Sequence, residues 1–305
     1  MSFETHIKRI DKRDWNEIKN EWLQSLPIIE DPFKPPESQL ADIPELSTIV
    51  KNVSSKGEYK IEYSPLRSEI FREAIFLFHK ALNVSGITEE NIKMGFNTWS
   101  LSNAYHCMFF SIKSILGFLG ISIPRVNGID YLVDIFPQKE ELSKTKIKRG
   151  IIPEPTMKFL RFTNLKHYNL WRIFQRILNV AIIPTWNNTF IKYLLRLDPL
   201  DFARQRNSLH YQNNFWVYDD LFKPAYIEGT GYHSEIILLV DNSKLQELQD
   251  FTVIMSFIIL SFAFQLMSDL SKIAPILDIE KNLIDELLQE SLHSTLKQYL
   301  VILNE

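Results

Sequence analysis

The sequence predicts a mainly α-helical protein, and three observations carry that prediction. Long segments repeat apolar residues at intervals of three and four, as one face of a helix requires. Only 9 of the 305 residues are glycine, and the phosphate-cradling patterns GxxxxGK(S/T) and GxGxxG are absent, which argues against a nucleotide-binding α/β enzyme. Apolar residues make up 45% of the chain and aromatic residues 12%, which is enough for a real core.

The cysteine and histidine content indicates the setting and limits the chemistry. A single cysteine, Cys107, cannot form an internal disulfide, and residues 1–25 lack the apolar core of a signal peptide. We therefore expect a cytoplasmic protein. The histidines show no metal-ligand spacing and no HExxH pattern, so we expect neither a bound metal nor a cofactor. His106 is expected to be a hydrogen-bonded core residue and not the base of a dyad with Cys107, because neighbours on a helix point about 100° apart.

Residues 1–64 are expected to form an N-terminal extension to a domain that spans residues 65–305. The extension begins with an amphipathic helix over about 12–25, and the proline-rich stretch PIIEDPFKPPES that follows cannot remain helical. The apolar side of that helix is formed by Trp15, Ile18, Trp22 and Leu23.

The domain is expected to begin with a helix at Pro65, because proline suits the first helical position. A longer central helix is predicted over about 97–119, where one apolar stripe repeats at alternating intervals of four and three. The members of this stripe are Leu101, Tyr105, Met108, Ile112, Ile115 and Leu119. Gly120 and Pro124 end the central helix, and the basic stretch KTKIKRGIIPEP is expected to form a loop.

The rest of the domain is predicted to alternate helices with one short β segment. Further helices are expected over about 164–180, 187–196, 243–271 and 280–303. Strand-like runs around Gly229 and Gly231 predict a small β insertion at about 215–242. The apolar stretch FTVIMSFIILSFAFQLM is about 17 residues long, contains Ser256, Ser261 and Gln265, and lacks a basic flank. We therefore expect a buried core helix there and no membrane partner.

The charge of the chain is distributed unevenly. Between Lys144 and Tyr211 there are 13 Lys and Arg residues and 3 acidic residues, so this segment carries +10 and the remainder −13. Such a field concentrates anionic partners, and aromatic residues interleaved with the cations can stack on bases. The RNA-binding candidates are Lys166, His167, Arg172, Arg176 and Tyr211. The alternative is that the cations solvate helix faces while the aromatic residues fill the core.

The segment LDPLDFARQRNSLHYQNN predicts a helix that carries the best candidates for chemistry. It opens with an Asp-Pro pair at 198–199, which is typical of an N-cap followed by the first helical position. Arg206 and His210 are four residues apart and therefore share one face, with Asn207 next to Arg206. Arg204 points about 120° away from His210 on an ideal helix. It therefore joins His210 only if the helix unwinds there.

These residue types suit the cleavage of RNA. A histidine exchanges a proton near neutral pH, and an arginine holds phosphate oxygens and stabilises charge that develops at phosphorus. If His210 deprotonated a ribose 2′-OH, attack on the adjacent phosphate would cut the strand without a metal and leave a 2′,3′-cyclic phosphate. Under the alternative, Arg206 pairs with an acid, and the helix dipole favours His210 near a helix C-terminus.

Two segments resemble the HEPN superfamily, named for higher eukaryotes and prokaryotes nucleotide-binding. SLSNAYHCMFFSIKSILGFLG (100–120) resembles the early core helix of these domains, and ARQRNSLHY (203–211) resembles their active-site helix. The motif of that helix is an arginine, four to six residues and then a histidine, which Arg204 and His210 satisfy with five residues between them. In many members a polar residue follows the motif arginine, and here Arg206 has the asparagine. Either arginine remains a candidate.

The resemblance spans about residues 65–215 and implies both a fold and an activity. The fold is a HEPN-like helical bundle that dimerises so that two motifs face each other across a cleft. The activity is metal-independent cleavage of RNA, often by a toxin or an anti-phage effector that is paired with an antitoxin or another defence protein. The catalytic candidates are Arg204, Arg206, Asn207 and His210. The alternative is a non-catalytic HEPN-like module that binds nucleic acid or a partner protein.

Overall fold

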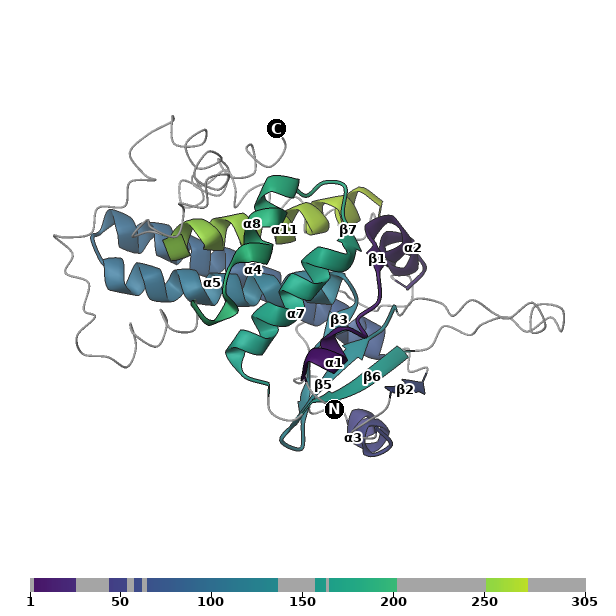
Figure 1. The fold of residues 1–305 in the computed structure, drawn as a ribbon. Helices are drawn as coiled ribbons and strands as arrows, with labels where there is room; N and C mark the ends of the chain where they lie inside the picture. The colour runs from purple at the N-terminus through teal and green to yellow at the C-terminus, as the bar shows by residue number, and fades with distance from the viewer. Residues whose placement is uncertain are drawn as a thin grey trace, which may run out of the picture.

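The computed structural model describes residues 3–25, 44–53, 58–61, 65–136, 157–162, 165–201 and 251–273. These residues are mostly helical, as the sequence predicts. The main helices are α4 (Pro65–Lys93), α5 (Asn97–Phe118), α7 (His167–Val180), α8 (Asn188–Arg196) and α11 (Phe251–Ile273). Helices α4 and α5 lie side by side, α11 packs along them, and a small sheet lies at one end of this helical layer (Figure 1).

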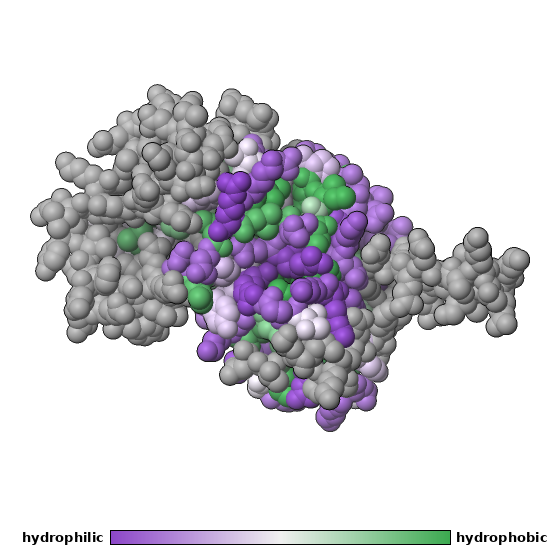
Figure 2. All heavy atoms as spheres, viewed as in Figure 1, coloured by the Kyte–Doolittle hydropathy of each residue, from purple (hydrophilic) through white to green (hydrophobic). Residues whose placement is uncertain are grey.

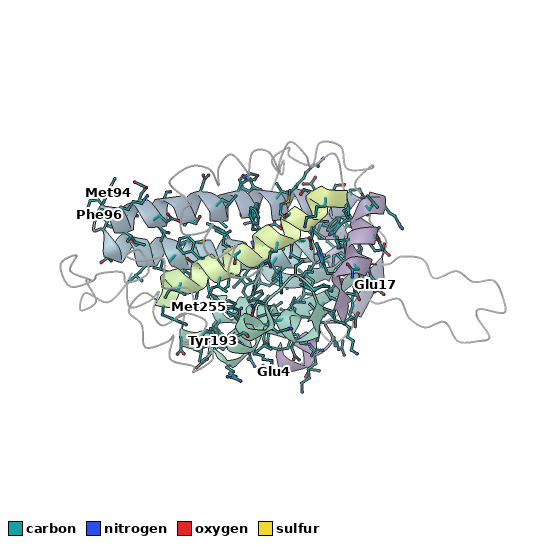
Figure 3. All side chains as sticks on the ribbon, turned by 90° about the horizontal axis from the view of Figure 1, so that it is seen from above. Glu4, Glu17, Met94, Phe96, Tyr193 and Met255 are labelled. Carbon is teal, nitrogen blue, oxygen red and sulfur yellow. The ribbon has the colours of Figure 1, made fainter. Side chains whose placement is uncertain are left out.

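Helices α4 and α5 form a long hairpin at the centre of the fold. Helix α4 begins at Pro65, as predicted, and the chain turns at Gly95, whose φ is +81°. Met94 and Phe96 mark the tip of the hairpin (Figure 3). The predicted apolar stripe of α5 is buried along its whole length. The two helices approach closely at Gly117, where a Cβ would lie 2.7 Å from the Cβ of Ala74.

Helix α11 is the helix that the sequence predicts as a buried core element. Among the described residues it alone is long and apolar enough to cross a membrane, but 89% of its most apolar stretch is buried inside the protein. It packs against α4 and α5. Ser256 and Ser261 satisfy their hydroxyl groups within the helix by donating to the carbonyl oxygens of Val253 and Ile258. These two serines therefore do not prevent the burial of the helix.

The N-terminal segment is built into the same core. It contains α1 (Phe3–Ile7), β1 (Arg13–Asp14) and α2 (Trp15–Ser25), and β1 pairs in parallel with β7 (Ala181–Ile182). Trp15 and Trp22 are fully buried, whereas Leu23, predicted on the same apolar side, is 44% exposed. The Trp22 indole donates to the carbonyl oxygen of Phe118 at 2.7 Å. The extension expected from the sequence is therefore packed against the end of α5.

A small antiparallel sheet completes the described fold. Its strands are β2 (Glu58–Ile61), β3 (Ile121–Ser122), β4 (Arg125–Val126), β5 (Ile129–Asp134) and β6 (Met157–Phe162). Their order is β2-β6-β5-β3, with β4 also paired to β5, and α3 (Pro44–Lys51) lies beside β4. These strands are a correction, because β structure was expected only at 215–242, which lies outside the described residues. Strands β5 and β6 are buried on both faces, so they lack the alternation that reveals a half-exposed strand.

A buried ion pair joins the N-terminal segment to this sheet. Arg13 Nη2 lies 2.5 Å from Asp134 Oδ2, and both side chains are almost fully buried. Arg13 also donates to the carbonyl oxygens of Leu119, at 3.1 Å, and Phe136, at 3.3 Å. One guanidinium therefore ties β1, β5 and the end of α5 together.

Candidate functional site

The residues predicted to carry catalysis lie outside the part of the chain that the structure describes. They are Arg204, Arg206, Asn207 and His210, with Tyr211 beside them. The structure does show how their segment begins. Asp198 Oδ1 accepts a hydrogen bond from the backbone N–H of Leu200 at 2.9 Å, and residues 199–201 are helical. The predicted helix start at Asp198 is confirmed, and the geometry of the motif stays a prediction.

The described chain just before this helix start is fixed in place by α7. The Gln175 side chain of α7 donates from Nε2 to the carbonyl oxygens of Leu194, at 2.9 Å, and Leu197, at 2.8 Å. These two carbonyls lie at the C-terminal end of α8, where backbone acceptors have no partner within the helix. Leu197 is itself buried. Helix α7 therefore sets the point from which the segment with the predicted motif departs.

The other end of α8 is held by the core helix α11. Asn187 is the N-cap of α8, and its Oδ1 accepts from the backbone N–H of Thr189 at 2.9 Å. The indole of the preceding residue, Trp186, stacks on Phe262 of α11 with a centroid distance of 4.7 Å. Its Nε1 donates to the carbonyl oxygen of Phe262 at 3.3 Å. Both ends of the helix that precedes the predicted motif are thus anchored.

Helix α7 and the residue directly before it carry four of the residues that the sequence nominates for RNA binding. Lys166 precedes the helix, His167 is its first residue, and both are exposed. The backbone N–H of Lys166 donates to Asn169 Oδ1 at 2.8 Å, so a side chain of α7 fixes the start of the helix. The surface around α7 is largely hydrophilic, with apolar residues between the polar ones (Figure 2).

The two arginines of α7 contact the N-terminal segment. Arg172 pairs with Glu4, and its guanidinium lies 5.2 Å from the ring centroid of Phe3. Arg176 Nη2 lies 3.3 Å from the carbonyl oxygen of Lys8, and it also donates to that of Ile10 at 3.2 Å. Glu4 lies at the edge of the molecule (Figure 3). Both arginines therefore have a structural role, and their contact with RNA stays a prediction.

His167 is held by the central helix α5. The Tyr105 hydroxyl lies 3.2 Å from His167 Nδ1, and the ring centroid of Phe109 lies 5.1 Å from that of His167. Tyr105 is buried in the apolar stripe of α5, so its hydroxyl orients the imidazole from a rigid position. An oriented and exposed imidazole beside Lys166 is able to exchange a proton with a ligand or to hold an anion. Sequence reasoning found His167 but missed the tyrosine.

The remaining described histidines and the cysteine are less suited to catalysis. His106 Nδ1 lies 2.9 Å from the carbonyl oxygen of Ser102, so the expected hydrogen bond is present. Burial lowers the pKa of His79 below its ordinary value. Burial raises the pKa of the Cys107 thiol to about 12, so this group is not a thiolate at neutral pH. Within the described ranges, no group of three or more His, Cys, Asp and Glu side chains is placed to hold a metal ion.

The arginine-histidine spacing of the predicted motif occurs twice more in the chain. Arg72 and His79 have six residues between them, and Arg161 and His167 have five. Arg72 forms a 2.5 Å ion pair with Glu69 on α4. Arg161 lies in β6, and its Nε is buried without a hydrogen-bond partner. Spacing alone therefore does not identify the motif.

One comparison with known proteins gave a match. Residues 74–166 match the model of the family described as the HEPN domain. This segment begins within α4, contains α5 and strands β3 to β6, and ends directly before α7. The predicted motif at 204–210 lies beyond it. No curated protein and no solved structure matches the chain.

Proposed function

Because residues 74–166 place this chain in the HEPN superfamily, with its nucleotide-related or RNase-type functions, we propose that it is a metal-independent endoribonuclease. The family match is the observation that carries the proposal. The histidine and arginines at 204–210 support it, because they follow directly after a confirmed helix start. A toxin or an anti-phage effector is the biological role that suits such an activity.

In the proposed reaction, the RNA supplies its own nucleophile. His210 takes the proton of a ribose 2′-OH, and the oxygen attacks the adjacent phosphorus. The bond from phosphorus to the 5′-oxygen then breaks, and the departing oxygen takes up a proton. Arg204 or Arg206 holds the phosphate oxygens, where charge develops, and Asn207 orients that arginine by hydrogen bonding. The products are a 2′,3′-cyclic phosphate and a 5′-hydroxyl.

Cleavage by the purified chain in the presence of a chelator tests this proposal. We expect His210→Ala to lower the rate by about 10²- to 10⁴-fold, as the loss of a general acid-base group does. His79→Ala is the matched control, because it removes a histidine with an arginine at the same type of spacing and belongs to neither set of RNA-binding candidates. Mass spectrometry of the RNA ends identifies the cyclic phosphate. Undiminished cleavage by His210→Ala, with loss of cleavage in His79→Ala, would move the site to Arg72 and His79.

A second candidate is a HEPN-like module that binds RNA or a protein without cutting. It is favoured by one specific observation, which is that the matched segment ends at residue 166, before the predicted motif. Under this alternative the chain binds RNA, the RNA stays intact, and His210→Ala leaves the affinity unchanged.

The partners and the setting belong to the same proposal. A homodimer would bring two copies of the motif to one cleft, and an antitoxin or defence-system protein would restrain them in the cytoplasm. Expression of the wild-type chain should then stop growth, and His210→Ala should restore it.

A further inference from the structure

A row of rings and lysines crosses one surface of the described fold. It runs from α4 over α5 to the first residue of α7, and we call it the aromatic-lysine strip. Its members are Phe76, Lys80, Phe109, Phe110, Lys113 and His167. The site residues predicted from the sequence include only one of these six.

The α4 end of the strip is built around one lysine. Phe76 and Lys80 lie one helical turn apart, and Lys80 Nζ is 4.5 Å from the ring centroid of Phe76. The same ammonium lies 5.6 Å from the ring centroid of Phe110 on α5. Lys80 is exposed and, within the described residues, contacts these rings and no acidic group. The lysine therefore bridges the two helices and keeps its charge at the surface.

The α5 end of the strip continues as adjacent rings. The ring centroids of Phe109 and Phe110 are 6.0 Å apart, and those of Phe109 and His167 are 5.1 Å apart. Lys113 Nζ lies 5.9 Å from the Phe109 centroid and 3.8 Å from a carboxylate oxygen of Glu73. Rings on three helices thus follow one another across the surface.

The rings of Phe109 and Phe110 lie at the edge of the buried side of the hairpin, where they pack against the core and stay partly exposed. On an ideal helix, Phe109 and Phe110 lie about 40° and 140° around from Tyr105, whereas Ile112 lies about 20° to the other side of it, in the buried stripe. Phe109 and Phe110 are only partly buried, and Phe76 is 39% exposed. The three neighbouring rings therefore leave part of their apolar surface accessible in one place, in contrast to a singly exposed apolar residue.

We propose that the aromatic-lysine strip is a docking surface for single-stranded RNA. Partly exposed rings with centroids about 5–6 Å apart offer apolar surface on which unpaired bases can pack, and the exposed Lys80 beside them complements a phosphate. Paired bases have no free faces for such stacking, so the strip selects single strands over duplex. That the ligand is RNA rests on the proposed function. The strip adds that the RNA is single-stranded.

Binding of a labelled 2′-O-methyl oligonucleotide to the full chain tests the strip. This probe lacks the attacking hydroxyl, so fluorescence anisotropy measures affinity without cleavage. We expect Phe76→Ala and Phe110→Ala each to weaken binding by at least about fivefold, as the loss of one stacked base does. Lys80→Gln should weaken binding and reduce the slope of log K against log salt by about 0.7, the value for one phosphate contact on a single strand.

Ile87→Ala is the matched control, because Ile87 is an exposed apolar residue of α4 outside the strip. Circular dichroism verifies that each variant is folded. Losses in the strip variants with none in Ile87→Ala support the proposal, even if the wild-type chain cuts no RNA. Three results would overturn the proposal. They are an equal loss of affinity in all four variants, an unchanged affinity in the strip variants, and an affinity for duplex RNA equal to that for the single strand. If the chain cuts RNA but its affinity does not depend on the strip, the proposed function survives and this inference fails.

Discussion

Two groups of cations in this protein serve different purposes, although the sequence gives them the same appearance. Arg172 and Arg176 of α7 lie in the most basic segment of the chain, and the structure shows both in contact with residues 3–10. Lys80 lies outside that segment, on a helix with several acids, and its ammonium is exposed over two rings. The most basic segment of the chain therefore contains arginines that hold the fold together. The exposed Lys80, which contacts two aromatic rings, lies outside that segment on α4.

The comparison shows that the groups a cation contacts decide whether it stabilises the fold or stays available to a ligand. Carbonyl oxygens and carboxylates fix a guanidinium in place. Each such contact uses N–H groups that could otherwise donate to a phosphate. An ammonium over an aromatic ring keeps its donors for a ligand. Three predictions test this distinction, in order of decreasing effect on stability.

The largest loss is expected when the buried guanidinium is removed. Arg13→Met leaves the Asp134 carboxylate buried without its partner, so we expect the free energy of unfolding to fall by about 3–5 kcal/mol. Urea denaturation measures it. The double variant Arg13→Met with Asp134→Leu removes the unpaired charge and should recover part of the loss. A single variant as stable as the double would show that the ion pair does not hold the N-terminal segment.

A smaller loss is expected at α7, and it should differ between the two arginines. Arg176→Ala removes two hydrogen bonds from a charged donor to backbone carbonyls and should cost about 1–3 kcal/mol. Arg172→Ala breaks a pair with an exposed glutamate and should cost less than about 1 kcal/mol. Urea denaturation and limited proteolysis near the N-terminus report both effects. Equal costs would contradict the assumption that the two hydrogen bonds of Arg176 stabilise the fold more than the ion pair of Arg172.

The smallest effect on stability is expected from the protonation of His79, which burial disfavours. His79 precedes Lys80 on α4, but it is largely buried beside Phe78, and burial lowers its pKa below 6.5. The unfolded chain therefore binds the proton more readily than the folded chain. Stability is complete above about pH 6.5 and falls as the pH drops towards the folded pKa. His79→Gln should reduce this decline between pH 7.5 and 5.5 in urea titrations, and an unchanged decline would contradict the assignment.

Local patterns predicted the helices well. The stripe from Leu101 to Leu119 is buried as expected, and the mostly apolar run at 251–267 is a core helix. Pro65 and Asp198 begin helices for reasons that lie within a few residues of each. These signals depend on residues that are close together in the sequence, so the sequence alone was enough to find them.

Contacts between distant parts of the chain could not be predicted in this way. Strands β5 and β6 pair across an interval that contains no periodic signal, and both are buried on two faces. The partners of Arg172 and Arg176 lie more than 160 positions away. The aromatic-lysine strip combines three helices, so no sequence window contains it. The motif at 204–210 was recognised from its spacing, a signal that two other pairs share.

The hydrogen bond between Trp15 and Asp269 has a consequence for synthesis of the protein. The Trp15 indole donates to Asp269 Oδ2 at 3.1 Å across 254 positions of the chain. At translation rates of 5–20 residues per second, the tryptophan emerges from the ribosome roughly 13–50 s before its partner. Trp22, whose acceptor is Phe118, finds its place much earlier. The contacts of α2 therefore form at two different times, and its first turn obtains its hydrogen-bond partner only after α11 has been synthesised.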